Sequence, residues 1–279
     1  MTSPLITRRQ GLVFAVSSLG LANAHAELKV EGDPELSARW LKVRAGLFGE
    51  RKISLKADDV IGLEAPKRAE DAAIVPIVIR ARFEQKPERF IRKVYLVIDD
   101  NPSPIAAIFS YTLDSGRADI ETRVRVDEYS HVRAIAETND GELFMATRYV
   151  KASGGCSAPP GKDAVAALAS IGQMRLRVQP DATPLRPTLV QLMVSHPNDS
   201  GMVMDQATRQ YTPPHFVRKI DVTYNGRLVL SADIDFAISE NPNLRFYFVP
   251  QEGGGELHAD VVDTKDLHFE RSFSLQSPM

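Results

Sequence analysis

Cysteine is almost absent from this sequence. The 279 residues contain one, Cys156, so the chain can form neither an internal disulfide nor a zinc site of paired cysteines. Other signatures are missing too: there is no H-E-x-x-H zinc motif, no G-x-S-x-G nucleophile elbow and no glycine loop leading into a helix that could cradle phosphate. We therefore expect no metal, no cofactor and no enzyme of these common classes.

An excess of positive charge is also lacking. The chain has 34 Lys and Arg against 36 Asp and Glu, which disfavours a nucleic-acid partner, because such proteins usually carry a basic excess or stripe. Apolar runs are too short to cross a membrane as a helix, so no membrane partner is expected. The histidines after residue 26 show no ligand spacing, and we interpret most of them as surface or turn residues: His131, His196, His215, His258 and His268.

The N-terminus has the order of a secretory signal. Arg8 and Arg9 precede an apolar run at residues 12–21, and small residues with A-x-A cleavage sites follow at 22–26. The paired arginines favour twin-arginine export, with general Sec export as the alternative. We therefore predict a signal peptide at residues 1–26 and a mature protein in the periplasm.

Short β patterns fill the chain before Cys156. Only residues 34–47 have helical spacing, and Trp40 there is interpreted as a core anchor. The dipeptides around Asn139-Asp140-Gly141 predict a hairpin between the last two strands. The predicted strands follow one another at spacings of roughly ten residues: 73–83, 93–98, 105–111, 120–126, 131–137 and 142–150.

A second β pattern, of about seven strands, begins at Met174. Asn225-Gly226 predicts a type I′ turn, and Gly253–Gly255 predict another hairpin between two strand patterns at 244–249 and 256–263. Residues 162–171, between the two β patterns, have the composition of a short helix. The spacing predicts an all-β chain of two β-sandwiches in tandem, with a short N-terminal helix in the first.

The only cysteine lies between these two patterns, in the stretch KASGGCSAPPGKDA at residues 151–164. Gly154 and Gly155 precede Cys156 and two prolines follow it, so neither a core strand nor a long helix is expected there. We interpret Cys156 as an exposed thiol on a mobile segment, with Gly154 and Gly155 supplying the flexibility. Such a thiol is suited to a covalent carrier, because it can deliver a bound group to the active sites of other enzymes.

Reactivity requires the thiolate form of this cysteine. Lys151 and Lys162 flank it and favour the anion modestly, and no His or Arg lies in the segment. The sequence therefore predicts a mild lowering of the thiol pKa.

Both halves of the chain resemble known sulfur-oxidation proteins. The first half resembles SoxY, the sulfur-carrier subunit of thiosulfate oxidation, and the second resembles its partner subunit SoxZ. The residues that carry the SoxY resemblance are Phe48-Gly49, Ile53, Leu55, 66–71, 75–77, 96–102 and Gly154-Gly155-Cys156. Those that carry the SoxZ resemblance are Ser195-His196-Pro197, Gly201, 223–226, 237–242 and 246–248. This order is similar to that of single-chain SoxYZ-like carriers associated with quinoprotein dehydrogenases.

The resemblance implies a domain layout and a role. It implies two immunoglobulin-like β-sandwich domains in tandem, a SoxY-like one at 27–152 and a SoxZ-like one at 174–279. They would share an intramolecular interface and be joined by a flexible segment at 153–173. It implies that Cys156 carries sulfur intermediates as covalent adducts and that the carrier is not an enzyme. Its partners would be periplasmic redox enzymes, either a c-type cytochrome or a quinoprotein dehydrogenase.

One departure from the family leaves alternatives open. In SoxY the Gly-Gly-Cys-Gly-Gly motif ends the chain, whereas here Cys156 is followed by a further domain, so its segment is held at both ends. We expect the thiol to enter a shallower partner pocket, which leaves the carried group undetermined. The first alternative is a non-catalytic accessory module for a quinoprotein dehydrogenase or its cytochrome, and the second is a cysteine-dependent enzyme.

Overall fold

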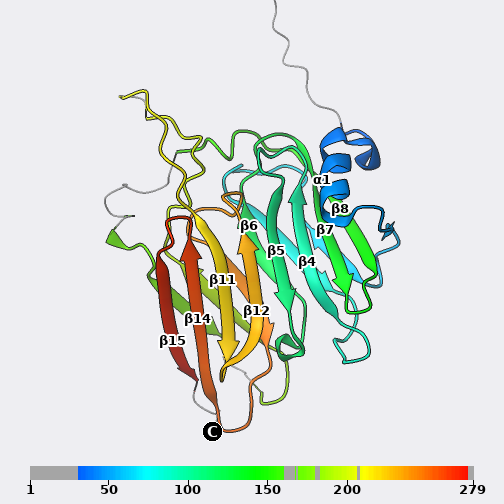
Figure 1. Ribbon diagram of the computed structural model, residues 1–279, viewed down its shortest axis with the longest axis vertical. Helices are drawn as coiled ribbons and strands as arrows, with labels where there is room; N and C mark the ends of the chain where they lie inside the picture. Colours follow the sequence, from blue (N-terminus) through cyan, green and yellow to red (C-terminus); the bar gives the residue numbers. More distant parts are fainter. Residues whose placement is uncertain (1–30, 160–166, 168, 180–182, 206–207, 276–279) are drawn as a thin grey trace, which may run out of the picture. The chain divides into compact units, whose positions relative to one another are not determined.

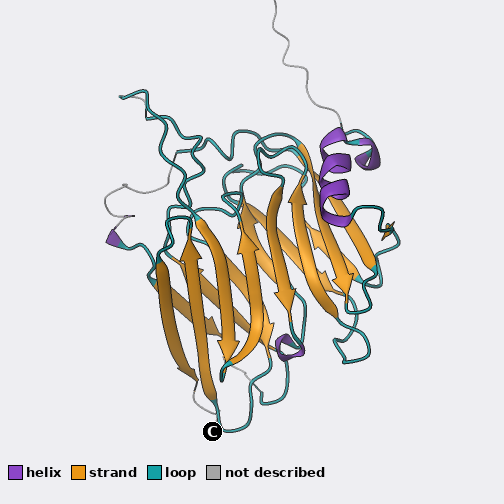
Figure 2. Cartoon of the chain, viewed as in Figure 1, coloured by secondary structure: helices purple, strands orange, loops and turns teal. Residues whose placement is uncertain are grey.

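The structure, a computed structural model, describes residues 31–159, 167, 169–179, 183–205 and 208–275. The predicted signal peptide at 1–26 lies outside these residues, and so does most of the predicted helix at 162–171. None of the helices within the described ranges is long and apolar enough to cross a membrane. Strands make up most of the regular structure that is described (Figure 2).

The first half of the chain (residues 31–152) opens with the predicted helix. Helix α1 (Ala38–Phe48) begins after Ser37, whose hydroxyl accepts the backbone N–H of Trp40, and ends at Gly49 with a φ of 56°. Trp40 is fully buried and packs with Phe48 and Tyr95 against the sheet, so its predicted core role is confirmed. The other elements of this half are η1 (Pro34–Leu36), β1 (Ile53–Ser54), β2 (Ile61–Glu64), β3 (Val75–Ala81), β4 (Ile91–Ile98), β5 (Ile105–Tyr111), η2 (Leu113–Ser115), β6 (Ile120–Val124), β7 (Ser130–Thr138) and β8 (Leu143–Val150).

The second half (residues 174–275) contains the predicted strands. They are β9 (Met174–Val178), β10 (Thr188–Val194), β11 (Val217–Tyr224), β12 (Arg227–Ile234), β13 (Asn243–Phe248), β14 (Gly255–Asp263) and β15 (His268–Leu275). Along β10, every second side chain is buried, as expected for a strand with one face on the core.

The turn predictions had mixed outcomes. Asn225 and Gly226 have φ values of 48° and 77°, the positive values that a type I′ turn needs, and they join the paired strands β11 and β12. The hairpin around Asn139-Asp140-Gly141 is also confirmed, because β7 and β8 pair antiparallel. The hairpin through Gly253–Gly255 was wrong, since β13 and β14 belong to different sheets. Glycines permit a reversal of the chain but do not determine which sheet the next strand joins.

Two sheets face each other, and each contains strands from both halves of the chain. The larger has the order β1-β8-β7-β4-β5-β12-β11-β14-β15, and the smaller has the order β2-β3-β6-β13-β10-β9. The halves meet where β5 pairs antiparallel with β12 and where β6 pairs antiparallel with β13 (Figure 1). The all-β fold class with immunoglobulin-like sandwiches is thus confirmed, and backbone pairing between the halves continues both sheets across the boundary.

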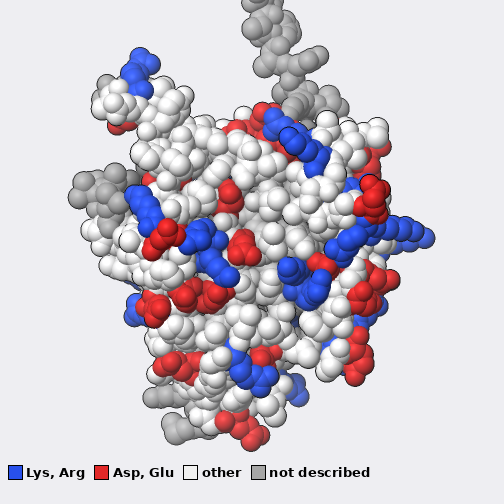
Figure 3. Space-filling view, in the orientation of Figure 1, with Lys and Arg blue, Asp and Glu red and all other residues white. Residues whose placement is uncertain are grey.

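The core is continuous in the same way. One buried cluster contains Val94 and Phe109 from the first half together with Val222 and Phe246 from the second. On the face shown in Figure 3, acidic and basic side chains alternate, and the described residues form no broad patch of one sign there. The two halves therefore share their interior, and the residues at their junction are held by sheets on both sides.

Candidate functional site

Cys156 lies at the junction of the two halves, and it is buried. Its exposed fraction is 1%, so the expectation of an exposed thiol was wrong for the conformation in the structure. The thiol turn (Gly154–Ser157) is held against the end of β6 by backbone hydrogen bonds. Gly154 N donates to Asp127 O at 2.8 Å, Gly155 N donates to Val126 O at 3.1 Å, and Cys156 N donates to Asp127 Oδ1 at 3.2 Å.

The two glycines permit this close packing. Gly154 has a φ of 79°, in the region that favours glycine. A Cβ atom on Gly155 would stand 2.1 Å from Ala72 O and 2.7 Å from Val126 O, so no larger residue fits without displacing backbone. The sequence interpretation took these glycines as a flexible tether. In the structure they allow the thiol turn to lie directly on the neighbouring backbone.

The second half closes the thiol turn from the other side. Ser200 Oγ donates to Cys156 O at 2.5 Å, and it also accepts the backbone N–H of Met202 at 3.2 Å. Its side chain is buried, so no water can replace a partner when one of these hydrogen bonds is lost. Ser200 belongs to the Pro197 loop (His196–Gly201), whose His196, Pro197 and Gly201 are among the residues that carry the SoxZ resemblance.

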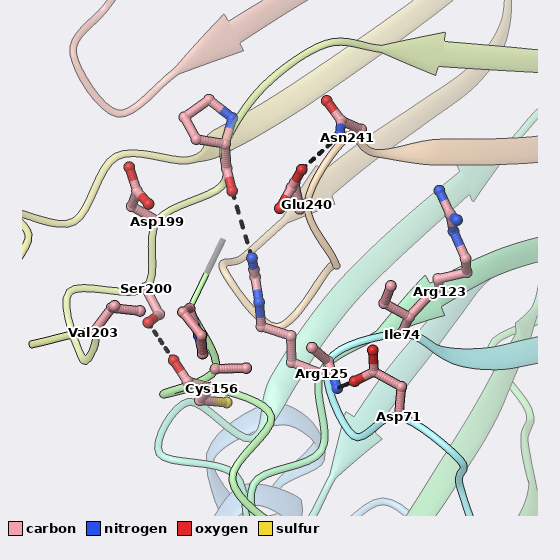
Figure 4. A pocket seen from close by; sticks show the side chains of 14 residues that line it. Asp71, Ile74, Arg123, Arg125, Cys156, Asp199, Ser200, Val203, Glu240 and Asn241 are labelled. Atoms are coloured by element: carbon pink, nitrogen blue, oxygen red, sulfur yellow. Dashed lines mark hydrogen bonds between the residues drawn. The ribbon is translucent and has the colours of Figure 1, made fainter. Parts of the chain in front are cut away.

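A cavity of about 420 Å³ opens beside Cys156 (Figure 4). Its lining includes Ile74 from the first half, Pro159 from the segment after it, and Pro197 and Val203 from the second half. The charged side chains at its walls are Asp71, Arg123, Arg125, Asp199 and Glu240. Both halves are thus needed to form the cavity, and sequence reasoning identified only its cysteine.

Arg125 connects the two halves at this cavity, because its side chain binds main-chain carbonyls of the second half. Its guanidinium is largely buried, with the residue 8% exposed. Nη1 donates to the main-chain carbonyls of Asn198, Phe236 and Ile238 at 2.8, 2.7 and 3.0 Å, and Nη2 donates to that of Pro197 at 3.4 Å. Desolvation lowers the pKa of Arg125 from its ordinary value. No feature of the sequence predicts this role, because Arg125 lies in an alternating strand pattern like any exposed arginine.

The thiol in this site is held in its protonated form. Burial raises the pKa of Cys156 to about 12, and the carboxylate of Asp127 is the next largest cause. The charge of Arg125 opposes this shift, whereas Asp235 adds to it. The predicted mild lowering of this pKa was therefore wrong. Lys151 is exposed, and Lys162 lies outside the described residues. A thiol with this pKa reacts slowly as a nucleophile until it reaches another environment.

Three histidines are buried, which corrects their interpretation as surface or turn residues: His131, His196 and His215. His215 Nε2 lies 2.7 Å from Asp263 Oδ2, and His196 Nε2 lies 3.5 Å from the same oxygen. Burial, with the neighbouring His215 next, lowers the pKa of His196 to about 4, so the His196 ring is neutral beside this carboxylate at neutral pH.

This cluster has ligand types that could hold a metal ion, but its hydrogen bonds do not fit one. The Nδ1 atom of His196 accepts the backbone N–H of Asn198 at 3.1 Å. The neutral ring therefore carries its proton on Nε2, the atom that would have to bind the metal. The cluster instead anchors the Pro197 loop, since the backbones of Asp199 and His215 also pair at 2.8 and 3.0 Å.

Comparisons with known families agree with this division of the chain. Residues 44–156 match the family described as sulfur oxidation protein SoxY, and residues 176–274 match the family described as sulphur oxidation protein SoxZ. The first match ends at Cys156. None of the curated protein sequences matches the chain at a significant level.

Solved structures resemble parts of the chain only distantly. The sulfur carrier protein SoxY from Chlorobium limicola f thiosulfatophilum is 21% identical, with 41% of this chain and 91% of that one covered and a TM-score of 0.33. A superoxide reductase (neelaredoxin) from Ignicoccus hospitalis is 14% identical, with 33% of this chain and 78% of that one covered and a TM-score of 0.30. Similarities at this level carry no argument about function.

Proposed function

The chain is a fused SoxYZ-like protein, a SoxY domain joined to a SoxZ domain, and on that premise we propose that it is a covalent carrier of sulfur intermediates on Cys156. The observation that carries the proposal is the position of the thiol. Cys156 is the only cysteine in the chain, it ends the SoxY match, and it faces a cavity that needs both domains. The sulfur-oxidation role belongs to the family, and the covalent use of Cys156 is the proposal.

Loading of the carrier requires a partner that accepts electrons. When the Cys156 sulfur joins the outer sulfur of an oxoanion such as thiosulfate, one S–S bond forms and the thiol loses its proton to solvent. Two electrons leave the pair of sulfurs and pass to a redox partner, which we propose to be a c-type cytochrome or a quinoprotein dehydrogenase. The carrier itself completes no turnover, so it is a substrate-bearing partner of enzymes.

The closed site supports a resting state for such a carrier. A thiol in an oxidising compartment such as the periplasm, where we propose that the protein works after twin-arginine export, is vulnerable when it is exposed and ionised. Burial and a raised pKa protect Cys156 from both conditions. Loading then requires the thiol turn to leave the site, which means breaking its contacts with Asp127 and Ser200.

The accessory module remains the second candidate, and the buried thiol favours it. A cysteine retained only for packing would be buried and protonated, as Cys156 is. A cysteine-dependent enzyme is disfavoured, because a nucleophilic thiol needs a lowered pKa and this one is raised.

The intact mass of the mature protein, purified from its own periplasm without reductant, tests the proposal. We expect a fraction with added sulfur or sulfonate on the Cys156 peptide, and reductant should remove any group linked through a disulfide. The Cys156→Ser variant, prepared in the same way, is the matched control and should carry no addition. An unmodified thiol in cells that are oxidising sulfur compounds would contradict the carrier and support the accessory module.

A further inference from the structure

The closed site provides a poor environment for negative charge on Cys156. The carboxylate of Asp127 accepts the N–H of Cys156 itself, at 3.2 Å. Asp235 acts on the same thiol electrostatically. The acidic side chains at the cavity walls outnumber the basic ones: Asp71, Asp199 and Glu240 against Arg123 and Arg125.

Of the two arginines, only Arg125 acts electrostatically on the Cys156 thiol, and it is already committed to other partners. Arg125 already donates to four main-chain carbonyls, including those of Asn198 and Ile238, and could turn towards the sulfur only by leaving some of them without a donor. Arg123 lies across the cavity from Cys156 (Figure 4). An anionic group on the sulfur would therefore be desolvated beside Asp127 with no new partner at the sulfur itself, since the unpaired Arg123 Nε belongs to the far side of the cavity.

Space, by contrast, does not exclude a small group. The cavity of about 420 Å³ begins at Cys156, so an uncharged adduct of a few atoms can occupy it with the thiol turn in place. The contacts that hold the turn are few: three backbone donors, of Gly154, Gly155 and Cys156, and the hydroxyl of Ser200. Charge, more than size, thus distinguishes what this site can retain.

We propose that the thiol turn is a charge-operated latch, which holds Cys156 in the cavity while its side chain is uncharged and releases it when the sulfur carries an anionic group. The proposal rests on the carrier function for the identity of that group. A sulfonate or other sulfur oxoanion on Cys156 remains ionised at physiological pH, so a loaded carrier would present its cargo to a partner and an unloaded one would withdraw its thiol.

The ionisation of the thiol itself supports this reading of the site. The raised pKa of Cys156, about 12, means that the closed site disfavours the thiolate by roughly three orders of magnitude relative to an ordinary thiol. A sulfonate adduct cannot escape this penalty by taking up a proton, because a sulfonic acid is far too strong an acid. Opening of the turn is the remaining way to relieve it.

Two alkylating agents test the latch with nearly identical shapes. Iodoacetate adds a negatively charged carboxymethyl group to Cys156, and iodoacetamide adds a neutral carbamidomethyl group of almost the same size. Hydrogen exchange of the Gly154, Gly155 and Cys156 amides then reports how often the turn opens. We expect exchange at least about tenfold faster in the carboxymethylated protein, with the amides of β11 and β12 unchanged as the internal control.

Equal hydrogen-exchange rates in the two alkylated proteins would overturn the latch, because the charge of the added group would then have no effect on opening of the turn beyond that of its size. Slower exchange in the carboxymethylated protein would overturn it as well, and would show that the cavity binds anions. Neither outcome touches the carrier function, whose test is the native adduct found by mass. Conversely, absence of any native adduct would contradict the carrier function, but it would leave unchanged the effect of a charged alkyl group on the exchange rates.

A pair of variants repeats the test without alkylation. Cys156→Asp and Cys156→Asn place a charged and a neutral side chain of nearly equal volume at the same position, and their thermal unfolding shows whether both remain folded. At pH 8 we expect faster exchange of the Gly154 and Gly155 amides in Cys156→Asp than in Cys156→Asn. Equal rates in two folded variants would contradict the latch.

Discussion

The two walls of the thiol cavity are built in different ways. One wall is the thiol turn, which follows the first half and whose backbone N–H groups donate to Val126 and Asp127 of that half. The wall from the second half is the Pro197 loop, which is anchored by buried side chains: Arg125 from the first half, and Asn198, His196 and Asp263 of its own half. The difference indicates that the Pro197 loop is the rigid wall of the cavity and that the thiol turn is the wall that can move away from it.

The largest expected effect is the loss of stability when Arg125, which anchors the Pro197 loop, is replaced. Arg125→Ala leaves the carbonyls of Pro197, Asn198, Phe236 and Ile238 without their donor, which should destabilise the fold by about 3 kcal/mol or more. Denaturant unfolding followed by circular dichroism measures the change. Arg123→Ala, at the same cavity, is the control and should cost less than about 1 kcal/mol. Equal unfolding midpoints for the two variants would mean that the carbonyl network contributes little.

Acid should weaken the same wall through His196. The folded-state pKa of this ring, about 4, lies below its ordinary value of 6.5, so the unfolded chain takes up the proton first as pH falls. Stability is therefore fully present above about pH 6.5 and is lost towards pH 4, by up to about 3 kcal/mol from this group.

Unfolding midpoints between pH 7 and pH 4.5 check this dependence. The His196→Gln variant should lose much of it. His131→Gln, which removes a buried histidine of the first half, should lose less, because burial and Arg133 lower the pKa of His131 while nearby acidic groups, Asp99 first, oppose the shift. If both variants keep the full wild-type slope, the acid sensitivity arises elsewhere.

Substitution of Gly155 should open the thiol turn without unfolding the protein. The added Cβ of Gly155→Ala meets Ala72 O and Val126 O, so the turn must leave its place, and we expect labelling of Cys156 by a thiol reagent to accelerate by about tenfold or more. In Gly154→Ala the nearest atom to the added Cβ is Ser157 Oγ at 4.0 Å, an ordinary contact, but the φ of 79° remains, which costs roughly 1 kcal/mol and should accelerate labelling less. Faster labelling of Cys156 in Gly154→Ala than in Gly155→Ala would contradict this prediction. It would mean that the positive φ of Gly154 matters more than the close contacts at Gly155.

The smallest effect concerns the hydrogen bond between the two walls at Ser200. Ser200→Ala removes its hydrogen bond to Cys156 O, worth about 1 kcal/mol, and should raise the labelling rate of Cys156 about fivefold. The exposed Ser274 provides the control, since Ser274→Ala should leave the rate unchanged. A wild-type rate in Ser200→Ala would show that the first wall holds itself closed.

Local pattern predicted much of the fold. The strand from Ile105 to Tyr111 has the bounds that its apolar run suggested, and Asn225-Gly226 forms the turn that its residue types favour. These predictions succeed because side-chain alternation and positive φ depend on neighbours in sequence. The hairpin through Gly253–Gly255 failed because the choice between two sheets depends on strands far away in the chain.

The sequence by itself determined most of the strands, though not β1 and β2, as well as the order of the two domains and the position of the only thiol in the chain. Only the tertiary structure decided that this thiol is buried and protonated, and that Arg125 is an anchor. The reason is distance along the chain: Ser200 and Cys156 are 44 residues apart, and Arg125 and the carbonyl of Ile238 are 113 apart. Burial and pKa follow from contacts of this kind, which glycines and prolines beside a cysteine do not reveal.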